Sequence, residues 1–371
     1  MSDAFRRRTR NAQRALRDRN AAAAVLFPGP NQFYVSGFEE EPGERHLLLF
    51  VPAEGDPVFV APTMYDEQIR DATWVEDLRL YDDGDDPAAL LGGVAGELDL
   101  AGERILLDDR MWALFVQDLR AAVPDADWGL AGEAFDALRM RKDDAELDAL
   151  RRAADLADEV SVAVRRLGED AVGLTERELA VEIEDRLTAG GGEGVAFETV
   201  AASGANGARP HHRSGDREIR AGDPVVLDFG AYVDGYPGDQ TRTVVFAGDP
   251  PAEFRRVHEV VRTAQNAAVE SVEPGVAAEA VDRAAREVIE DAGYGEQFVH
   301  RTGHGVGLEV HEPPYVVAGN ETTLQPGMVF SVEPGIYLEG RFGVRIEDLV
   351  AVTGDGHERL NDSPRGWRPP A

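Results

Sequence analysis

The sequence has 371 residues, 43% hydrophobic and 29% charged, so it is long enough for two domains and apolar enough to bury a core in each. Its formal net charge of −32, from 38 basic and 70 acidic residues, argues against a nucleic acid or an anionic membrane as a partner. The absence of cysteine excludes disulfides and thiolate ligands, so any metal site must use carboxylates and imidazoles.

The basic residues are nearly all arginine, since Lys142 is the single lysine. A strongly acidic, lysine-poor chain resembles halophilic proteins from salt-filled cytoplasm, although an acidic surface that only aids solubility explains the composition equally well. No segment resembles a signal peptide or is apolar over a length that spans a bilayer. We therefore expect a cytoplasmic protein with no membrane partner.

Strand-like and helix-like patterns alternate in the first part of the chain. This alternation predicts an α/β domain over residues 1–138. The clearest segments are helices over 12–19 and 111–121 and strands over 23–27, 46–51, 57–60 and 104–107.

A long amphipathic helix is predicted to open the second domain, because apolar residues recur every three or four positions over 147–167. The next helix begins at a capping box, in which Thr175 is followed three residues later by Glu178, and it ends at the glycines 190–192.

Two further helices are predicted over 252–271 and 277–292, with strand-rich blocks between and after the helix pairs. The layout favours an α+β domain over residues 139–371, with an antiparallel sheet and two similar halves.

A strand of the second domain carries a carboxylate inside an apolar run. Residues 225–230 read Val-Val-Leu-Asp-Phe-Gly, and because an unpaired buried charge is costly, Asp228 requires a cation. The Asp-Gly pair at 234–235 favours a two-residue hairpin turn. In that register Gly230 pairs with Asp239, and Asp228 lies one diagonal step from Asp239 on the same face. Two surface aspartates on a half-exposed hairpin are the alternative.

Residues 302–312 read Thr-Gly-His-Gly-Val-Gly-Leu-Glu-Val-His-Glu. The glycine spacing is not that of a dinucleotide-binding loop, so we reject a nucleotide. Glycines around His304 would let the backbone and a substrate approach a metal-bound imidazole closely, and His311 would serve as a proton donor or oxyanion stabiliser. Taken alone, each histidine fits a structural role better than a catalytic one.

The last strand-rich block carries two more carboxylates. Glu333 lies in the segment 329–334, and strand alternation places Arg345 and Glu347 on one face. The glycines between the two segments predict a hairpin that brings Glu333 and Glu347 together.

Four carboxylates and one imidazole thus form a candidate metal cage, in which two divalent cations would balance four negative charges. Oxygen ligands with a single imidazole suit manganese, cobalt or zinc. Two such ions can share a water, lower its pKa and clamp the carbonyl that it attacks, which is the chemistry of amide hydrolysis. The five side chains are Asp228, Asp239, His304, Glu333 and Glu347.

In combination, these segments resemble the pita-bread metallopeptidases, a family that includes Xaa-Pro dipeptidases, aminopeptidases P and methionine aminopeptidases, with creatinase as a metal-free relative. The resemblance implies that Asp239 and Glu347 bridge two ions. Asp228 would complete one site, and His304 with Glu333 the other. The matching motifs are Asp-Phe-Gly at Asp228, Asp239 before Thr-Arg-Thr, Gly-His-Gly-x-Gly at His304, Val-Glu-Pro-Gly at Glu333 and Val-Arg-Ile-Glu-Asp at Glu347.

The resemblance also implies roles around the metals. His211 looks like the family's substrate-side histidine, with the adjacent His212 as the alternative. A hydroxide bound by both metals would attack the carbonyl before proline, Glu333 would shuttle the proton, and His211 or His311 would stabilise the tetrahedral intermediate. The further matches to active-site residues are His300, His311, Tyr337 and Arg345.

The first domain resembles the creatinase-like, ribonuclease H-like amino-terminal domain at Asn31, Tyr34 and Gly37. Methionine aminopeptidases normally lack this domain, so that activity is disfavoured. Relatives with the domain are commonly dimers, so the resemblance implies a homodimer.

The sequence thus predicts a metallopeptidase that cleaves the Xaa-Pro bond of proline-containing dipeptides or short peptides with two divalent ions, manganese favoured and cobalt or zinc as alternatives. A dipeptidase (prolidase) is favoured over an Xaa-Pro aminopeptidase because the amino-terminal part is short. A creatinase-like or ectoine-hydrolase-like C–N hydrolase is a further alternative, and a binding module on an inactive scaffold is disfavoured by the intact cage.

One position departs from the dipeptidase pattern. Tyr315 stands four residues after His311, where some prolidases place an arginine that can hold the carboxylate of the dipeptide. Arg345 or an arginine of the first domain would have to replace it.

Overall fold

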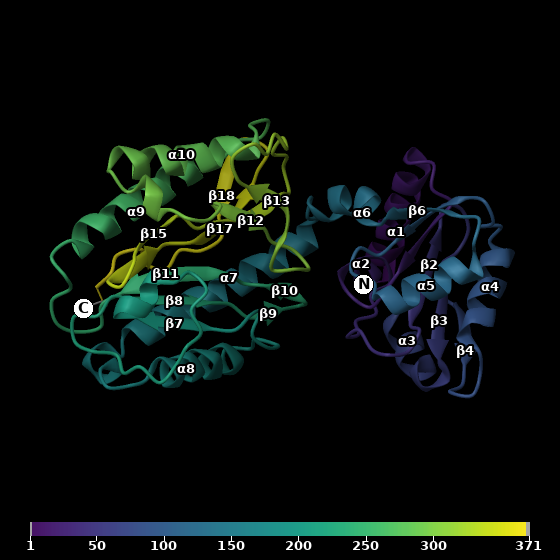
Figure 1. Ribbon diagram of the computed structural model, residues 1–371, viewed down its shortest axis with the longest axis horizontal. Helices are drawn as coiled ribbons and strands as arrows, with labels where there is room; N and C mark the ends of the chain where they lie inside the picture. Colours follow the sequence, from purple (N-terminus) through teal and green to yellow (C-terminus); the bar gives the residue numbers. More distant parts are fainter. Residues whose placement is uncertain (1, 369–371) are drawn as a thin grey trace. The chain divides into compact units, whose positions relative to one another are not determined.

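The computed structural model describes residues 2–368 (Figure 1). The chain divides into two compact units, Met1–Arg139 and Met140–Ala371, which we call the first and second unit. Within the described range, no helix combines the length and the apolar character needed to cross a membrane.

The first unit is the predicted α/β domain. Its six-stranded sheet has the order β4-β3-β2-β1-β5-β6, in which β2 runs antiparallel to its neighbours and the remaining pairs are parallel. The strands are β1 (Ala23–Leu26), β2 (Leu48–Pro52), β3 (Val58–Pro62), β4 (Asp77–Tyr81), β5 (Arg104–Leu107) and β6 (Asp127–Leu130). The helices are α1 (Ser2–Asp18), α2 (Pro30–Ser36), η1 (Thr63–Tyr65), α3 (Asp66–Ala72), α4 (Pro87–Glu97), α5 (Ala113–Ala122) and α6 (Gly132–Arg139).

Helix α1 starts well before the predicted residue 12, because two of the arginines ahead of that point, Arg6 and Arg8, pack on aromatic rings. The guanidinium of Arg8 lies 4.9 Å from the ring centroid of Tyr34, and that of Arg6 lies 4.6 Å from Trp74. Their aliphatic stems therefore cover apolar surface while the charged heads stack on rings.

The second unit has two pairs of long helices, as predicted. Helix α7 (Asp144–Arg165) and helix α8 (Glu176–Ala189) both begin with complete capping boxes. The second pair is α9 (Phe254–Glu270) and α10 (Ala278–Asp291). Short 3-10 turns lie at η2 (Gly168–Ala171), η3 (Gly204–Ala208) and η4 (Gly295–Gln297).

All strand pairs of the second unit are antiparallel, in sheets of order β11-β8-β7 and β13-β12-β14-β17-β18 and in the two-stranded ribbons β10-β9 and β15-β16. The strands are β7 (Val200–Ser203), β8 (Val225–Phe229), β9 (Tyr232–Val233), β10 (Tyr236–Pro237), β11 (Gln240–Val244), β12 (Gly303–Gly305), β13 (Glu312–Val316), β14 (Val329–Val332), β15 (Gly335–Leu338), β16 (Phe342–Arg345), β17 (Asp348–Val352) and β18 (His357–Arg359).

Each helix pair packs on its own strands, which gives the predicted two halves. One core joins apolar residues of α7 and α8 to β8 and β11, and another joins α9 and α10 to β14, β16 and β17. Figure 1 shows α9 and α10 on one side of these strands and α8 on the opposite side. The second unit thus has the antiparallel pita-bread architecture.

The strand registers that bring the carboxylates together are confirmed. Asp234 and Gly235 have φ of 51° and 75°, as a type I′ turn requires. Beyond the turn Thr241 pairs with Asp228 and Gln240 with Phe229, so Asp239 is a diagonal neighbour of Asp228. In the last hairpin Gly335 pairs with Arg345, which brings the residues just beyond this pair close together.

Candidate metal centre and active-site pocket

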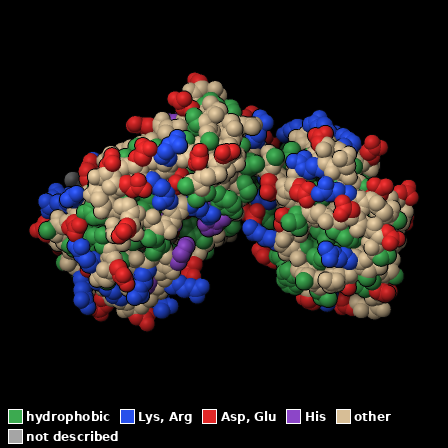
Figure 2. Space-filling model, turned by 45° about the horizontal axis from the view of Figure 1, so that its top comes forward, with side chains coloured by type: hydrophobic (Ala, Val, Ile, Leu, Met, Phe, Trp, Pro, Cys, Tyr) green, Lys and Arg blue, Asp and Glu red, His purple; other side chains and the backbone are tan. Residues whose placement is uncertain are grey.

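A pocket of about 570 Å³ opens in the second unit and contains every predicted site residue except Tyr337. Its walls come from β7 and the segments on either side of it, from the β8–β11 hairpin, from the segment around β12 and from the ends of β14 and β16. Histidine side chains reach the surface of this unit (Figure 2). Residues that lie far apart in the sequence therefore share one solvent-accessible cavity.

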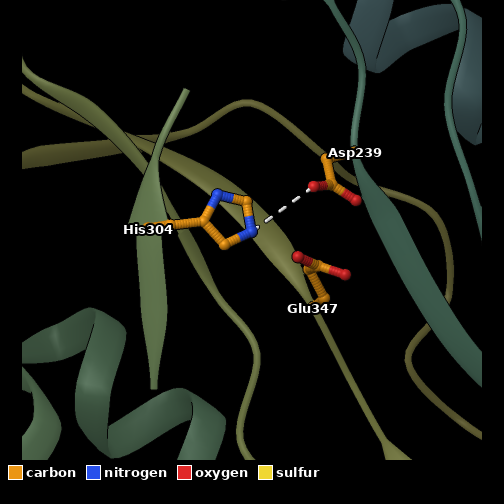
Figure 3. Close-up of side chains that lie close together, drawn as sticks. All are labelled: Asp239, His304 and Glu347. Atoms are coloured by element: carbon orange, nitrogen blue, oxygen red, sulfur yellow. Dashed lines mark ion pairs between the residues drawn. The ribbon is translucent and has the colours of Figure 1, made fainter. Parts of the chain in front are cut away.

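Three candidate ligands form its tightest cluster. Asp239 precedes β11, His304 lies on β12 and Glu347 follows β16. One ligand atom from each lies within 4.8 Å of the other two, and all three residues are buried (Figure 3). Nε2 of His304 is 3.7 Å from Oδ2 of Asp239. Two carboxylates and an imidazole that converge in this way form a donor set suited to a divalent cation.

The other two candidate ligands flank this cluster. Oε1 of Glu333, which follows β14, lies 3.3 Å from Nε2 of His304. On β8, Oδ2 of Asp228 accepts a hydrogen bond from the guanidinium of Arg345, whereas its Oδ1 is buried with no hydrogen-bond partner among the described residues. Burying a carboxylate oxygen without a hydrogen bond costs free energy, and a bound cation would offset that cost.

The carboxylates carry more negative charge than the surrounding protein neutralises. Burial, reinforced by neighbouring carboxylates, raises the pKa of Asp239 and of Glu347 well above the ordinary values. Burial also raises the pKa of Asp228, although Arg345 opposes the shift. Burial acts on Glu333 in the same sense, but the hydrogen bond from His304 and the positive charges of His304, His300 and Arg345 together outweigh it and lower the pKa of Glu333 to about 2. The residues therefore fit a bound divalent metal, whose positive charge would satisfy the orphaned oxygen and the excess charge.

A chain of hydrogen bonds supports Asp228 from behind. Arg345 also donates to the hydroxyl of Tyr337, over 3.0 Å, and that hydroxyl lies 2.8 Å from Nε2 of His300. Burial raises the pKa of Tyr337 to about 12 and lowers the pKa of His300, so both are neutral at neutral pH. Nδ1 of His300 must donate to the carbonyl of Arg301, 2.7 Å away, so Nε2 accepts from Tyr337.

His311 lies beside the cluster, with its ring centroid 4.1 Å from that of His304. Burial, assisted by the charge of His304, lowers the pKa of His311 to about 4. A neutral ring at this place can still donate an N–H hydrogen bond to a developing oxyanion.

The neighbouring histidines 211 and 212 have different surroundings. His211 is exposed at the pocket wall, whereas Nε2 of His212 is 2.7 Å from Oε2 of the buried Glu176. The geometry favours His211 as the residue that faces a substrate.

The glycines around His304 allow the close backbone approach that the sequence predicted, and the approaching backbone belongs to the neighbouring strands. A Cβ at Gly303 would lie 1.8 Å from the carbonyl oxygen of Ser331, and one at Gly305 would lie 2.3 Å from that of Pro313. Strand β12 lies between β13 and β14 and leaves no space for side chains at these positions.

Sequence reasoning missed one residue that lines the pocket and one buried ion pair next to the pocket-lining His311. Arg301 lines the pocket, and its guanidinium lies 4.4 Å from the ring centroid of Tyr315. The single lysine, Lys142, is fully buried and forms a 2.7 Å ion pair with Glu312, the residue after His311. The position of Arg301 directly after His300 was a usable signal for the first, but nothing local in the sequence pairs Lys142 with Glu312, 170 residues away.

The fold and the pocket define the class of protein, and comparison with known families agrees: the chain belongs to metallopeptidase family M24, which it matches over residues 148–354. Residues 8–141 match the creatinase/prolidase N-terminal domain. The resemblance inferred from the motifs is thereby confirmed.

The most informative relatives are dipeptidases. The chain is 42% identical to the probable dipeptidase PepE of Mycobacterium tuberculosis over 98% of this chain and 96% of the relative. It is 36% identical to the Xaa-Pro dipeptidase of Lactobacillus helveticus over 95% and 96%. Among solved structures, it is similar to recombinant prolidase from Thermococcus sibiricus, with a TM-score of 0.93 and 38% identity over 98% of each chain.

Proposed function

We propose that this chain is a metal-dependent Xaa-Pro dipeptidase, which hydrolyses the bond before the proline of a dipeptide. The observation that carries the proposal is the convergence of four carboxylates and one imidazole in a single pocket with excess negative charge. The names of its relatives, which include Xaa-Pro dipeptidases, support the choice of substrate.

The site would hold two divalent ions, with manganese favoured over cobalt and zinc. Such ions, when bound, polarise a carbonyl and lower the pKa of water. The residues that would hold them are Asp228, Asp239, His304, Glu333 and Glu347.

The protein's own groups have distinct tasks in this proposal. Glu333 has a pKa of about 2, so it is a carboxylate at neutral pH. In this proposal it takes up the proton of the attacking water. His211 or His311 donates an N–H hydrogen bond to the oxygen of the tetrahedral intermediate. The hydrogen-bonded chain through Arg345 and Tyr337 keeps Asp228 in place.

The free carboxylate of a dipeptide needs a cation, and Arg301 supplies it in this proposal. Arg345 is committed to Asp228, Tyr337 and, over 3.0 Å, the hydroxyl of Thr241. Arg301 lines the pocket and stacks on Tyr315, the residue that replaces the expected arginine. Stacking on a ring restricts the guanidinium and leaves its edge free to bind a carboxylate through two hydrogen bonds.

A substrate panel tests the function. We expect manganese-loaded protein to hydrolyse Leu-Pro with a higher kcat/KM than Leu-Pro amide or Leu-Pro-Gly, because only the dipeptide presents a carboxylate next to the cleaved bond. Faster cleavage of the tripeptide would favour an Xaa-Pro aminopeptidase. Turnover of ectoine or creatine without turnover of any peptide would replace the proposal with a C–N hydrolase.

The same assay tests Arg301. Arg301→Leu is expected to lower kcat/KM for Leu-Pro by about 10- to 100-fold, mainly through KM, because a charge-assisted hydrogen bond to the substrate is lost. Its kcat/KM for Leu-Pro amide should not change. Arg213→Leu is the matched control, since Arg213 also lines the pocket but pairs with Glu198 at 3.4 Å. A larger loss in the Arg213 variant would transfer the role to that residue.

We further propose that the protein is a cytoplasmic homodimer, that it binds no nucleic acid and that it is adapted to high salt.

Acidic and basic side chains are interspersed over the visible surface (Figure 2). Above about 1 M salt the Debye length is only about 3 Å, so screening of repulsion is nearly complete. The free energy of unfolding of a halophilic protein, measured by denaturant titration, should continue to rise at KCl concentrations above about 1 M. If the free energy of unfolding stops rising below about 1 M KCl, the acidic surface has only a solubilising role.

A further inference from the structure

Glu176 is a fully buried carboxylate at the first residue of α8, and it is not part of the pocket lining. Its Oε1 accepts hydrogen bonds from the backbone N–H of Ser203 over 2.7 Å and from the hydroxyl of Ser203 over 2.8 Å. The amide of Asn206 donates to both oxygens, over 3.0 and 3.1 Å. Oε2 also accepts from Nε2 of His212, over 2.7 Å, and from the N–H of Gly215, over 3.3 Å. One carboxylate thus binds the last residue of β7 and three residues of the segment that follows it.

That segment forms one wall of the pocket. Residues 210–213 line the cavity, yet between β7 and β8 the chain has only the short turn η3 as regular structure. Without a ladder of strand hydrogen bonds, the conformation of such a wall depends on its side-chain contacts, which include those of Ser214 to the backbone of Thr199 and Ala201 as well as those to Glu176. The contacts to Glu176 include one from His212, directly beside the exposed His211.

The charge of Glu176 suits this task. Burial opposes ionisation, but the hydrogen bonds from Ser203, Asn206 and His212 outweigh it and lower the pKa of Glu176. The carboxylate also lies in the first turn of α8, where the helix dipole favours a negative charge. Glu176 is therefore an ionised acceptor fixed to a helix end, and the segment 203–215 is bound to it.

We propose that Glu176 and His212 are a positioning pair, which fixes this wall so that His211 faces the candidate metal centre. The inference rests on the proposed function, because it takes His211 as the substrate-side histidine. Neither member of the pair is required to touch the reacting atoms.

The test compares two substitutions of His212, because changing Glu176 removes several hydrogen bonds at once. His212→Gln keeps an N–H donor near the place of Nε2, whereas His212→Ala removes it. We expect His212→Ala to lower kcat/KM for Leu-Pro by about 10- to 100-fold, the cost of displacing a group that must be aligned, and His212→Gln to restore most of the loss. If the imidazole of His212 itself acts on substrate, both variants will be equally impaired.

A double variant tests whether Glu176 and His212 act through His211. If they do, His211→Ala combined with His212→Ala should be no slower than His211→Ala alone. Multiplicative losses would overturn the proposal. Glu178→Gln is the matched control on α8, since Glu178 is exposed and, among the described residues, its carboxylate accepts hydrogen bonds only from Thr175. This variant should keep the kcat/KM of the unmodified protein.

Amide hydrogen exchange supplies a measurement independent of turnover. Exchange over residues 203–215 should accelerate in His212→Ala and return to the original rate in His212→Gln, with no change in Glu178→Gln. Unaltered exchange in His212→Ala would refute the pair as the tether of this wall. If the unmodified protein hydrolyses no Xaa-Pro peptide, the proposed function fails, and exchange alone still decides whether the pair fixes the segment.

Discussion

Glu333→Gln is expected to lower kcat for Leu-Pro by about 10²- to 10⁴-fold while the protein still binds its metal ions. The pKa of about 2 makes Glu333 a carboxylate at neutral pH, held 3.3 Å from His304. Glutamine has the same shape and keeps one oxygen ligand, but its amide cannot accept the proton of the attacking water. Steady-state kinetics on protein whose metal content has been measured by atomic emission tests the expectation.

The control is Glu339→Gln, because Glu339 is exposed in the same hairpin, between β15 and β16. It should retain full activity and metal content. A Glu333→Gln variant that is loaded with metal and active would refute the proton-transfer role. An inactive variant that has also lost metal would limit Glu333 to a role as ligand.

The second large effect is on the metal-free protein: Glu347→Gln is expected to stabilise it at pH 8. Burial and the neighbouring charges of Glu333 and Asp228 raise the pKa of Glu347 well above its ordinary value. The folded chain therefore retains a proton that the unfolded chain releases near pH 4, so this contribution to stability is complete below that pH and is lost as the pH rises through the raised pKa.

Glutamine carries no charge, so the variant should avoid this loss and gain about 1 to 3 kcal/mol in the free energy of unfolding at pH 8. Thermal unfolding in the presence of a chelator, from pH 5 to pH 8, measures the difference. Added manganese should then raise the Tm of the unmodified protein and have little effect on the variant, because one of the proposed metal ligands is gone.

Two results would contradict this account of the cage. One is a metal-free Glu347→Gln protein less stable than the unmodified protein at pH 8, with Glu339→Gln unchanged. The other is a metal-free unmodified protein whose stability does not fall as the pH rises. If instead the metal-free cage lowers the free energy of unfolding, as we expect, the protein is less stable without metal because its side chains are arranged to bind metal.

Local patterns in the sequence were sufficient for most of the fold. The capping box at Thr175 and Glu178 and the turn at Asp234 and Gly235 were predicted from a few adjacent residues, and both are present. Such features depend on backbone preferences and hydrogen bonds between residues close in sequence, so neighbours alone determine them. The start of α1 was missed because it depends on aromatic rings from elsewhere in the first unit.

The candidate ligands could also be named from the sequence, because carboxylates in apolar strands need a cation and because the motifs around them resemble a known family. The hairpin register predicted the closeness of Asp228 and Asp239 for the same local reason. The sequence did not reveal which cations the protein itself supplies. Arg345 reaches Asp228 across 117 positions of the chain.

How the residues around the ligands are used depends on the tertiary structure. It bound His212 to Glu176 across 36 positions and left His211 exposed, and it placed Arg301 over Tyr315 on the pocket wall. Spacing along the chain carries no information about such contacts, because they exist only once separate elements have packed. The sequence alone therefore determined the chemistry that this protein can perform, whereas packing determined which side chain is free for each task.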